Sequence, residues 1–388
     1  MHSAARKQVR GDPLRFFAAD DVERARRYHR PLYWAAAAEA ALELALLATL
    51  AWTQVGDALD PTSLPWWQRT LAYAAIIVAI SAAMQTPLAY WRGYLRERRW
   101  QLSTQRLGAW ASDRLKATGV NIVLTSALLL GLVALARTFT GWWVVPAAAA
   151  AALAAILLSF LAPVVIAPIF NRYVPLREEP LSAELRALAA TAAVPVEDVL
   201  VEDTSRRTRK ANAYVAGLGR TRRLVVSDTL LAAAPPAELR TVVAHELGHR
   251  RERHLLFGTL ISAAGAVAAT IVVWALLGTQ VADPHLLPVV LLLGFALGLA
   301  ALPPVTAVSR SWERSADRYA LQLTKEPAAY QSVFRRLAAT NLSDLDPPAM
   351  VYFLLFTHPT TAERLAAAAT ADEVRSPDAS VGETTQEG

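Results

Sequence analysis

The sequence contains no cysteine among its 388 residues. Disulfide bonds, thiolate metal ligands and a cysteine nucleophile are therefore excluded. A catalytic metal in this chain has to be held by histidine and carboxylate side chains, the other common ligands of such sites. Histidine is itself scarce, with seven residues, so few positions can contribute.

Acidic residues are outnumbered by basic ones, 33 against 39, which gives a net charge of +6. A basic excess can indicate nucleic-acid binding. Here, however, the arginines cluster beside long apolar runs, as they do in loops that face an anionic membrane leaflet. Because 54% of the residues are apolar, we predict a membrane protein whose neighbour is the lipid bilayer, and no nucleic-acid partner.

Six apolar runs are long enough to cross a bilayer as helices. They are residues 32–55, 69–90, 120–136, 142–167, 255–277 and 286–308. The loop 56–68 has no Lys or Arg, whereas the segment 91–116 is rich in arginine. By the positive-inside rule, both termini and the larger polar regions are predicted to face the cytoplasm, in a multi-pass protein of the cell membrane.

This pattern predicts a mainly α-helical polytopic membrane protein with a cytoplasm-facing polar domain that carries a small β-sheet. The predicted organisation is a basic N-terminal segment (1–31), four spans (32–168), the first half of the polar domain (169–253), two spans (254–308), its second half (309–369) and a disordered tail (370–388). The segment 1–31 is too long and too charged for the start of a signal peptide, so we expect it to be retained.

Glu39 and Glu43 lie within the first span, one helical turn apart. Carboxylates inside a membrane are costly unless they face protein or water. They indicate either a polar interior between helices or a position near the membrane interface. A transport function is suggested by these two residues alone.

The motif His-Glu-Leu-Gly-His occupies residues 245–249, after predicted strands at 199–202, 211–217 and 223–226 and a turn near 219–221. On a helix, His245 and His249 point the same way and can hold one zinc ion, while Glu246 faces the attacking water as general base. The alternative is a solvated face of an amphipathic helix. The neighbouring apolar residues and the preceding prolines favour a built metal site for peptide hydrolysis. The cytoplasm-facing polar domain is therefore predicted to be a zincin-like catalytic domain.

A catalytic zinc ion usually has three protein ligands. His254 follows His249 by five positions, which on a continuous helix is the wrong face. Glu313 and Asp317 instead stand at i and i+4 after the sixth apolar run, so Glu313 can be the third ligand and Asp317 can hold a ligand histidine by its other ring nitrogen. The alternative is a surface helix with alternating charges.

Further motifs make the chain resemble the type 1 CAAX prenyl proteases, integral-membrane zinc metalloproteases. The matching segments are I-A-P-I-F-N-R-Y at 166–173, N-A-Y at 212–214, S-D-T-L-L at 227–231, H-E-L-G-H at 245–249, E-R-S-A-D at 313–317 and H-P-T-T-A-E-R-L at 358–365. The high alanine and arginine content is typical of a bacterial homologue.

The resemblance implies that His245, His249 and Glu313 bind zinc and that Glu246 is the base. It also implies that His358 donates to the oxyanion, that Arg364 holds substrate or scaffold, and that Asn212, Ala213 and Tyr214 form an edge strand that binds a peptide substrate, lipidated or membrane-bound. The alternatives are an HtpX-like quality-control protease and a non-catalytic zinc-binding membrane scaffold. A site-2 protease is disfavoured, because its zinc motif lies inside a membrane span.

Overall fold

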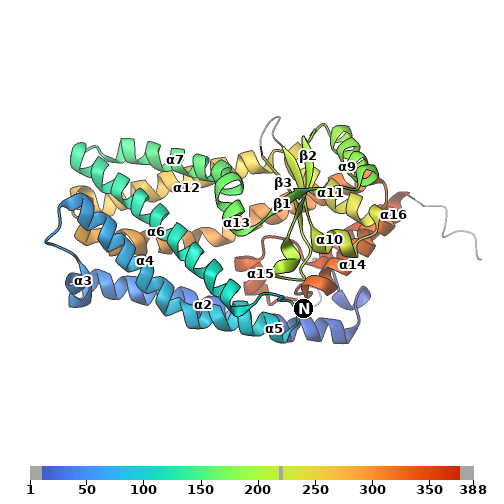
Figure 1. The fold of residues 1–388 in the computed structure, drawn as a ribbon, viewed down its shortest axis with the longest axis horizontal. Coiled ribbons are helices and arrows are strands. Elements are labelled where there is room, and N and C mark those ends of the chain that lie inside the picture. Colours follow the sequence, from blue (N-terminus) through green and yellow to red (C-terminus); the bar gives the residue numbers. More distant parts are fainter. Residues whose placement is uncertain (1–10, 218–221, 376–388) are drawn as a thin grey trace, which may run out of the picture.

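The computed structural model describes residues 11–217 and 222–375. Within them, six helices are long and apolar enough to cross a membrane. They are α2 (Ala19–Trp52), α4 (Trp66–Tyr90), α6 (Leu107–Thr138), α7 (Val144–Leu161), α12 (His254–Leu277) and α13 (Leu287–Thr324). They lie along the long axis of the molecule, and a domain of shorter helices and a sheet closes one end (Figure 1). This confirms the predicted fold class.

Two of these helices extend beyond the apolar runs and enter the compact domain. Helix α2 begins at Ala19, inside the segment predicted to precede the first span, and its first turns carry ion pairs from Glu23 to Arg26 and Arg27. Helix α13 continues without a break to Thr324, even though Pro303 and Pro304 lie within it. The sixth span and the segment that carries Glu313 are therefore one rigid element.

The sheet at the end of the molecule has four strands in the order β1-β2-β4-β3. They are β1 (Tyr173–Pro175), β2 (Asp198–Glu202), β3 (Ala213–Ala216) and β4 (Arg223–Ser227). Strands β2 and β4 are parallel, and the two outer pairs are antiparallel. The three predicted strands are present, β1 was not predicted, and the predicted turn at 219–221 lies outside the described residues.

Short helices surround the sheet and complete the catalytic domain. They are α9 (Glu179–Thr191), α10 (Asp228–Ala233), α11 (Pro236–Arg251), α14 (Pro327–Asn341), α15 (Ala349–Leu355) and α16 (Thr361–Arg375). Except for α15, their buried faces share one apolar core with the sheet, which includes Leu224, Leu247 and Leu365. Burial of this core fixes the sheet against α11 and α16.

Helix α16 extends over 370–375, into the segment that was predicted as a disordered tail. Its alanine-rich sequence explains the extension, since alanine has the highest intrinsic helix propensity. The remainder of that segment, 376–388, lies outside the described residues.

The spans form a second apolar core at the opposite end of the molecule. It includes Tyr73, Ile77, Val133, Trp143 and Leu287. Elsewhere the spans expose their apolar side chains; Val145, Leu153 and Leu157 of α7 are 63%, 56% and 48% exposed. Such an apolar outer surface is what lipid contact requires.

The two glutamates of the first span face helix α4 and the turn that follows it. Glu43 Oε2 accepts hydrogen bonds from Ser81 Oγ at 2.5 Å and Gln85 Nε2 at 2.6 Å. Glu39 forms an ion pair with Arg92 at 2.9 Å. Both carboxylates therefore have protein partners, which favours a polar contact between helices over simple solvation.

Candidate active site

Helix α11 places the three residues of the His-Glu-Leu-Gly-His motif on one side. Pro236 at its first turn favours a helix start, because its missing N–H needs no partner there. Leu239, Val243 and Leu247 are fully buried against the core. This packing turns His245 and His249 toward Glu313 of helix α13 and leaves Glu246 facing a cavity beside them.

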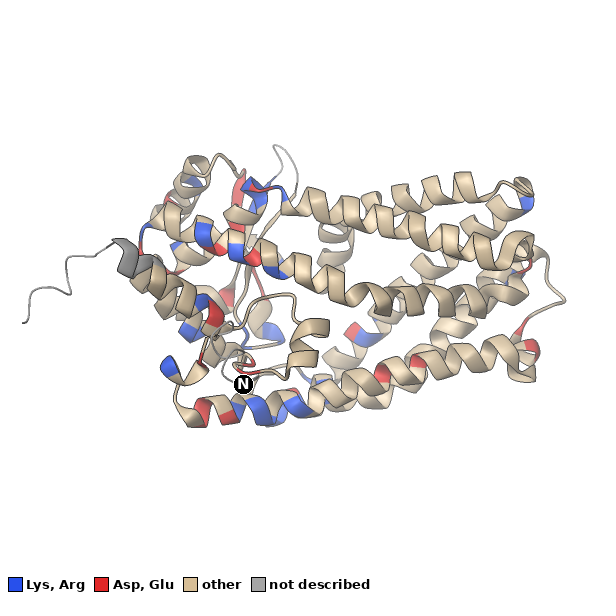
Figure 2. Cartoon of the chain, turned by 180° about the vertical axis from the view of Figure 1, so that it is seen from behind, with Lys and Arg blue, Asp and Glu red and all other residues tan. Residues whose placement is uncertain are grey.

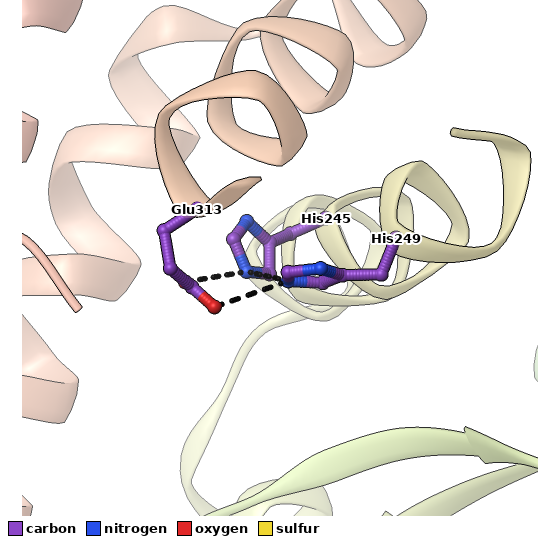
Figure 3. Close-up of side chains that lie close together, drawn as sticks. All are labelled: His245, His249 and Glu313. Atoms are coloured by element: carbon purple, nitrogen blue, oxygen red, sulfur yellow. Dashed lines mark hydrogen bonds and ion pairs between the residues drawn. The ribbon is translucent and has the colours of Figure 1, made fainter. Parts of the chain in front are cut away.

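Three side chains from α11 and α13 converge on one point (Figure 3). The ligand atoms of His245, His249 and Glu313 all lie within 4.8 Å of one another. His245 Nε2 is 3.3 Å from Glu313 Oε2, and His249 Nε2 is 3.2 Å from Glu313 Oε1 and 3.2 Å from His245 Nε2. The sequence-predicted ligands are thus brought together.

The donor set fits a metal ion on its chemistry as well as on its geometry. Two neutral imidazoles and one carboxylate are a common set for a catalytic divalent metal with an open position. Among the described residues, Glu313 Oε2 is a buried oxygen without a hydrogen-bond partner. A buried carboxylate oxygen in that state is costly unless a cation or a donor satisfies it.

Asp317 supports His245 from behind. Its Oδ1 lies 2.9 Å from His245 Nδ1, and its two oxygens accept hydrogen bonds from Nε and Nη2 of Arg364, with Nε 3.0 Å from Oδ2. Arg364 in turn lies over the ring of Phe334, 3.7 Å from its centroid. Helices α13, α14 and α16 therefore cooperate to orient one histidine.

The carboxylates around His245 dominate its electrostatics. Burial alone would lower the pKa of this imidazole, but its close contacts with the carboxylates of Asp317 and Glu313 outweigh burial and raise the pKa to about 9. The same negative surroundings stabilise a metal cation. For Glu246 burial is the largest influence, and it raises the pKa of that carboxyl.

His358 lies on the loop between α15 and α16, at the open side of the cluster. Its Nε2 is 3.3 Å from Glu313 Oε1, and its Nδ1 is 2.8 Å from Thr357 Oγ1. Its side chain is 59% exposed. An exposed ring nitrogen at this distance can reach a substrate atom beside the metal position.

Strand β3 offers a free edge to this site. Ser227 N donates to Asn212 O at 2.9 Å, so the alternation of an antiparallel pair turns the main-chain groups of Ala213 and Val215 away from β4. The carbonyl of Val215 accepts a hydrogen bond from Arg250. In the described part of the chain, no strand pairs with this edge.

A cavity of about 510 Å³ joins these elements. Asn212, Ala213, Glu246, His358 and Arg364 all line it. The side chain of Tyr214 does not; its hydroxyl donates to Tyr173 Oη at 3.1 Å, on the other face of the sheet. A side-chain contact of Tyr214 with substrate is therefore not formed by this arrangement.

Sequence reasoning missed two contributions to the site. Helix α2 forms one wall of the cavity through His29 and Tyr33, although 1–31 was predicted as a separate segment. His254, set aside because of its angle on the helix, lies with its Nδ1 3.0 Å from His249 Nδ1. The helical angle does not apply, because α11 ends at Arg251 and Arg253 adopts a left-handed conformation with φ 60°.

Together, the spanning helices, the His-Glu-x-x-His helix, the converging carboxylate and the adjacent edge strand define a membrane-embedded metalloprotease. Residues 175–372 match the profile of peptidase family M48, and residues 5–172 match the profile described as CAAX prenyl protease N-terminal, five membrane helices. The chain belongs to peptidase family M48. Within 11–170, the structure has four helices suited to span a membrane.

Relatives of known name agree with this assignment. The protein named "uncharacterized metalloprotease YhfN" of Bacillus subtilis (strain 168) is 30% identical over 312 residues, covering 76% of this chain and 72% of the relative. CAAX prenyl protease 1 of Saccharomyces cerevisiae is 24% identical over 334 residues, covering 77% and 72%. The resemblance seen in the motifs is thereby confirmed, and so is a metalloprotease activity.

The crystal structure of S. mikatae Ste24p has the same fold. It superimposes with a TM-score of 0.75 at 20% sequence identity and covers 91% of this chain and 89% of that chain.

Proposed function

We propose that this protein is a zinc endopeptidase that cleaves membrane-attached polypeptides on the cytoplasmic side of the cell membrane. The observation that carries the proposal is the convergence of His245, His249 and Glu313 beside the free edge of β3. A metal triangle next to an edge strand can hold a main chain and hydrolyse it in one place.

Zinc is the proposed metal, held by His245, His249 and Glu313. With no cysteine in the chain, the site has three nitrogen and oxygen ligands and leaves a position open, the arrangement of catalytic rather than structural zinc. When bound, zinc would lower the pKa of a water molecule toward neutrality and polarise the scissile carbonyl.

The chain's own side chains then carry the proton and the developing charge. Glu246 lines the cavity next to His245, where its carboxylate would accept the proton of the attacking water and return it to the leaving amine. His358 Nε2 donates to the oxyanion of the tetrahedral intermediate. Asp317 and Arg364 orient His245, and we assign Arg364 to this scaffold because its Nε and Nη2 both donate to Asp317.

The substrate main chain would lie along β3, paired with the N–H and C=O of Ala213. Asn212 flanks this position at the cavity surface, whereas Tyr214 pairs with Val225 of β4 and so holds the strand in register. The hydrogen bond from Arg250 to the Val215 carbonyl ends the available edge. Strand addition of this length fixes a short stretch of substrate next to the metal.

An attached lipid or apolar segment has a place beside the catalytic cavity. A second cavity of about 810 Å³ is lined mainly by apolar residues of α2, α13 and α15, and shares Tyr33, Asp344 and Leu355 with the first. Because α2 and α13 are spanning helices, a substrate anchored in the bilayer can approach from this side. This supports a lipidated or membrane-bound substrate.

The charge distribution supports the proposed orientation. Basic residues gather at the end that carries the sheet and on the adjoining turns of the spans, and the far ends of the helices carry few (Figure 2). At that far end Arg69 is paired with Asp60 and Asp283, so its charge is compensated. By the positive-inside rule, this distribution supports an active site that faces the cytoplasm.

The test uses the full-length protein purified in detergent. Its zinc content is measured, and cleavage is followed for a prenylated peptide ending in a CAAX sequence and for an unlipidated, unfolded polypeptide. Cleavage of the lipidated peptide that disappears with a chelator and returns with zinc is expected, and Glu246→Gln should abolish it while zinc stays bound.

Hydrolysis that survives in Glu246→Gln with zinc bound would contradict the mechanism. Preferential cleavage of the unlipidated chain would identify the quality-control alternative instead. Stoichiometric zinc without cleavage of either substrate would support the scaffold alternative.

A further inference from the structure

The side of His249 that is turned away from Glu313 contacts a second histidine. His249 Nδ1 lies 3.0 Å from His254 Nδ1. The ring of His254 is stacked on Trp312, with centroids 5.2 Å apart and planes inclined by 13°, and the residue is 7% exposed. Its orientation is therefore set by packing, independently of the contact with His249.

A single arrangement of protons satisfies both the contact of His249 with His254 and the contact of His254 with Glu252. If His249 offers Nε2 to a metal, its proton is on Nδ1 and is donated to His254 Nδ1. His254 then carries its own proton on Nε2, which lies 3.2 Å from Glu252 Oε2. Glu252 also accepts a hydrogen bond from the hydroxyl of Ser315 on α13.

We propose that His254, held in place by Glu252, is a positioning residue that fixes the ring orientation and tautomer of His249. It does for His249 what Asp317 does for His245. This inference rests on the proposed role of His249 as a metal ligand. It adds a residue that stands outside the His-Glu-x-x-His motif and the carboxylate motif.

The chain geometry gives the contact a structural consequence. Helix α11 ends at Arg251, and Arg253 has φ 60°, so the helix is interrupted before α12 begins at His254. The first residue of the fifth span therefore touches a ligand of the metal. The contact between His249 and His254 therefore couples metal binding to the placement of α12 after α11.

The test measures zinc affinity of the full-length, detergent-purified protein by competition with a fluorescent chelator. His254→Phe keeps the aromatic stack on Trp312 but removes the acceptor, and we expect zinc to bind roughly 10 to 100 times more weakly. His254→Asn places an oxygen near the position of Nδ1 and should restore most of the affinity. His285→Phe, at the other end of the spans, should leave affinity unchanged.

Cobalt substitution gives a second readout that does not depend on activity. The visible spectrum of the Co²⁺-loaded protein should change in His254→Phe and return toward that of the wild type in His254→Asn. If His254→Phe does not fold, Glu252→Ala provides the test, because it removes the acceptor that fixes the His254 tautomer, and it should also weaken zinc binding.

The outcomes separate this inference from the proposed function. If His249→Ala binds zinc as tightly as the wild type, His249 is not a ligand and the proposed site fails. If His249→Ala loses zinc while His254→Phe keeps wild-type affinity and spectrum, the positioning role is overturned and the site stands. An Asn variant as weak as the Phe variant would reduce His254 to a packing residue.

Discussion

Gly248 of α11 lies directly against Ala316 of α13. A Cβ atom at position 248 would be 3.1 Å from the Cα of Ala316 and 3.2 Å from Cδ1 of Tyr319. These two helices carry His249 and Glu313, one residue after Gly248 and three residues before Ala316. The absence of a side chain at 248 thus sets how closely the two halves of the metal site approach.

We expect Gly248→Ala to weaken zinc binding and to lower stability by about 1–3 kcal/mol, as overpacking of a tight core does. The added methyl group meets backbone atoms, which cannot move without displacing α13. Zinc affinity and thermal unfolding of the purified variant measure both effects. Gly265→Ala on α12 is the matched control, because its Cβ would have no atom within 4 Å. Equal zinc affinities of the two variants would show that this helix approach does not control the site.

Arg364→Lys should weaken zinc binding roughly tenfold, although the charge is kept. Lysine cannot give Asp317 two parallel hydrogen bonds, and it loses the flat contact with Phe334. His245 then becomes less firmly oriented. Chelator competition measures the change.

Arg336→Lys provides the comparison, since Arg336 also donates two hydrogen bonds to one carboxylate, that of Glu238. It should reduce stability without changing zinc affinity. The role assigned to Arg364 would be wrong if both lysine variants bound zinc like the wild type.

Substrate pairing with Ala213 predicts which peptide bonds of a substrate are sensitive to N-methylation. Methylation of a substrate nitrogen removes the N–H that donates to the Ala213 carbonyl. The lost hydrogen bond is worth about 0.5–1.5 kcal/mol, so kcat/KM should fall roughly 2- to 13-fold. A series of peptides methylated at one amide each, compared with their unmethylated parent, measures this. A uniform response along the series would argue against strand addition at β3.

The lowered pKa of the Glu238 carboxyl, away from the metal site, predicts that the stability of the fold depends on pH. Burial raises the pKa of this carboxyl, but hydrogen bonds from Arg336 and Ser332 outweigh burial and lower it. Because the folded pKa lies below the unfolded value of about 4.3, this group stabilises the fold above that pH and the contribution is lost as pH falls through the folded pKa.

Glu238→Gln should therefore be less stable than the wild type near neutral pH, and the difference should shrink below about pH 4. Thermal unfolding of both proteins over a series of pH values gives the comparison. A difference that stays constant across the series would mean that ionisation of Glu238 does not contribute.

Much of the candidate site could be predicted because its signals are local. The i, i+4 spacing of His245 and His249, and that of Glu313 and Asp317, each places two side chains on one helical face. The apolar runs identified the six spans for a similar reason, since the length needed to cross a bilayer is a property of one segment. The resemblance of the short motifs then related segments that are far apart in the chain.

The sequence by itself therefore determined the class of protein, its spans, and the residues capable of holding a metal. The tertiary structure alone decided that α13 runs unbroken from the membrane to Glu313, that α2 lines the cavity, that Gly248 meets Ala316, and that His254 faces His249. These features depend on where one helix stops and how two helices pack. Because Arg253 has a positive φ, the helical phase of α11 does not continue into α12. The pattern of hydrophobic residues in the sequence does not indicate this break.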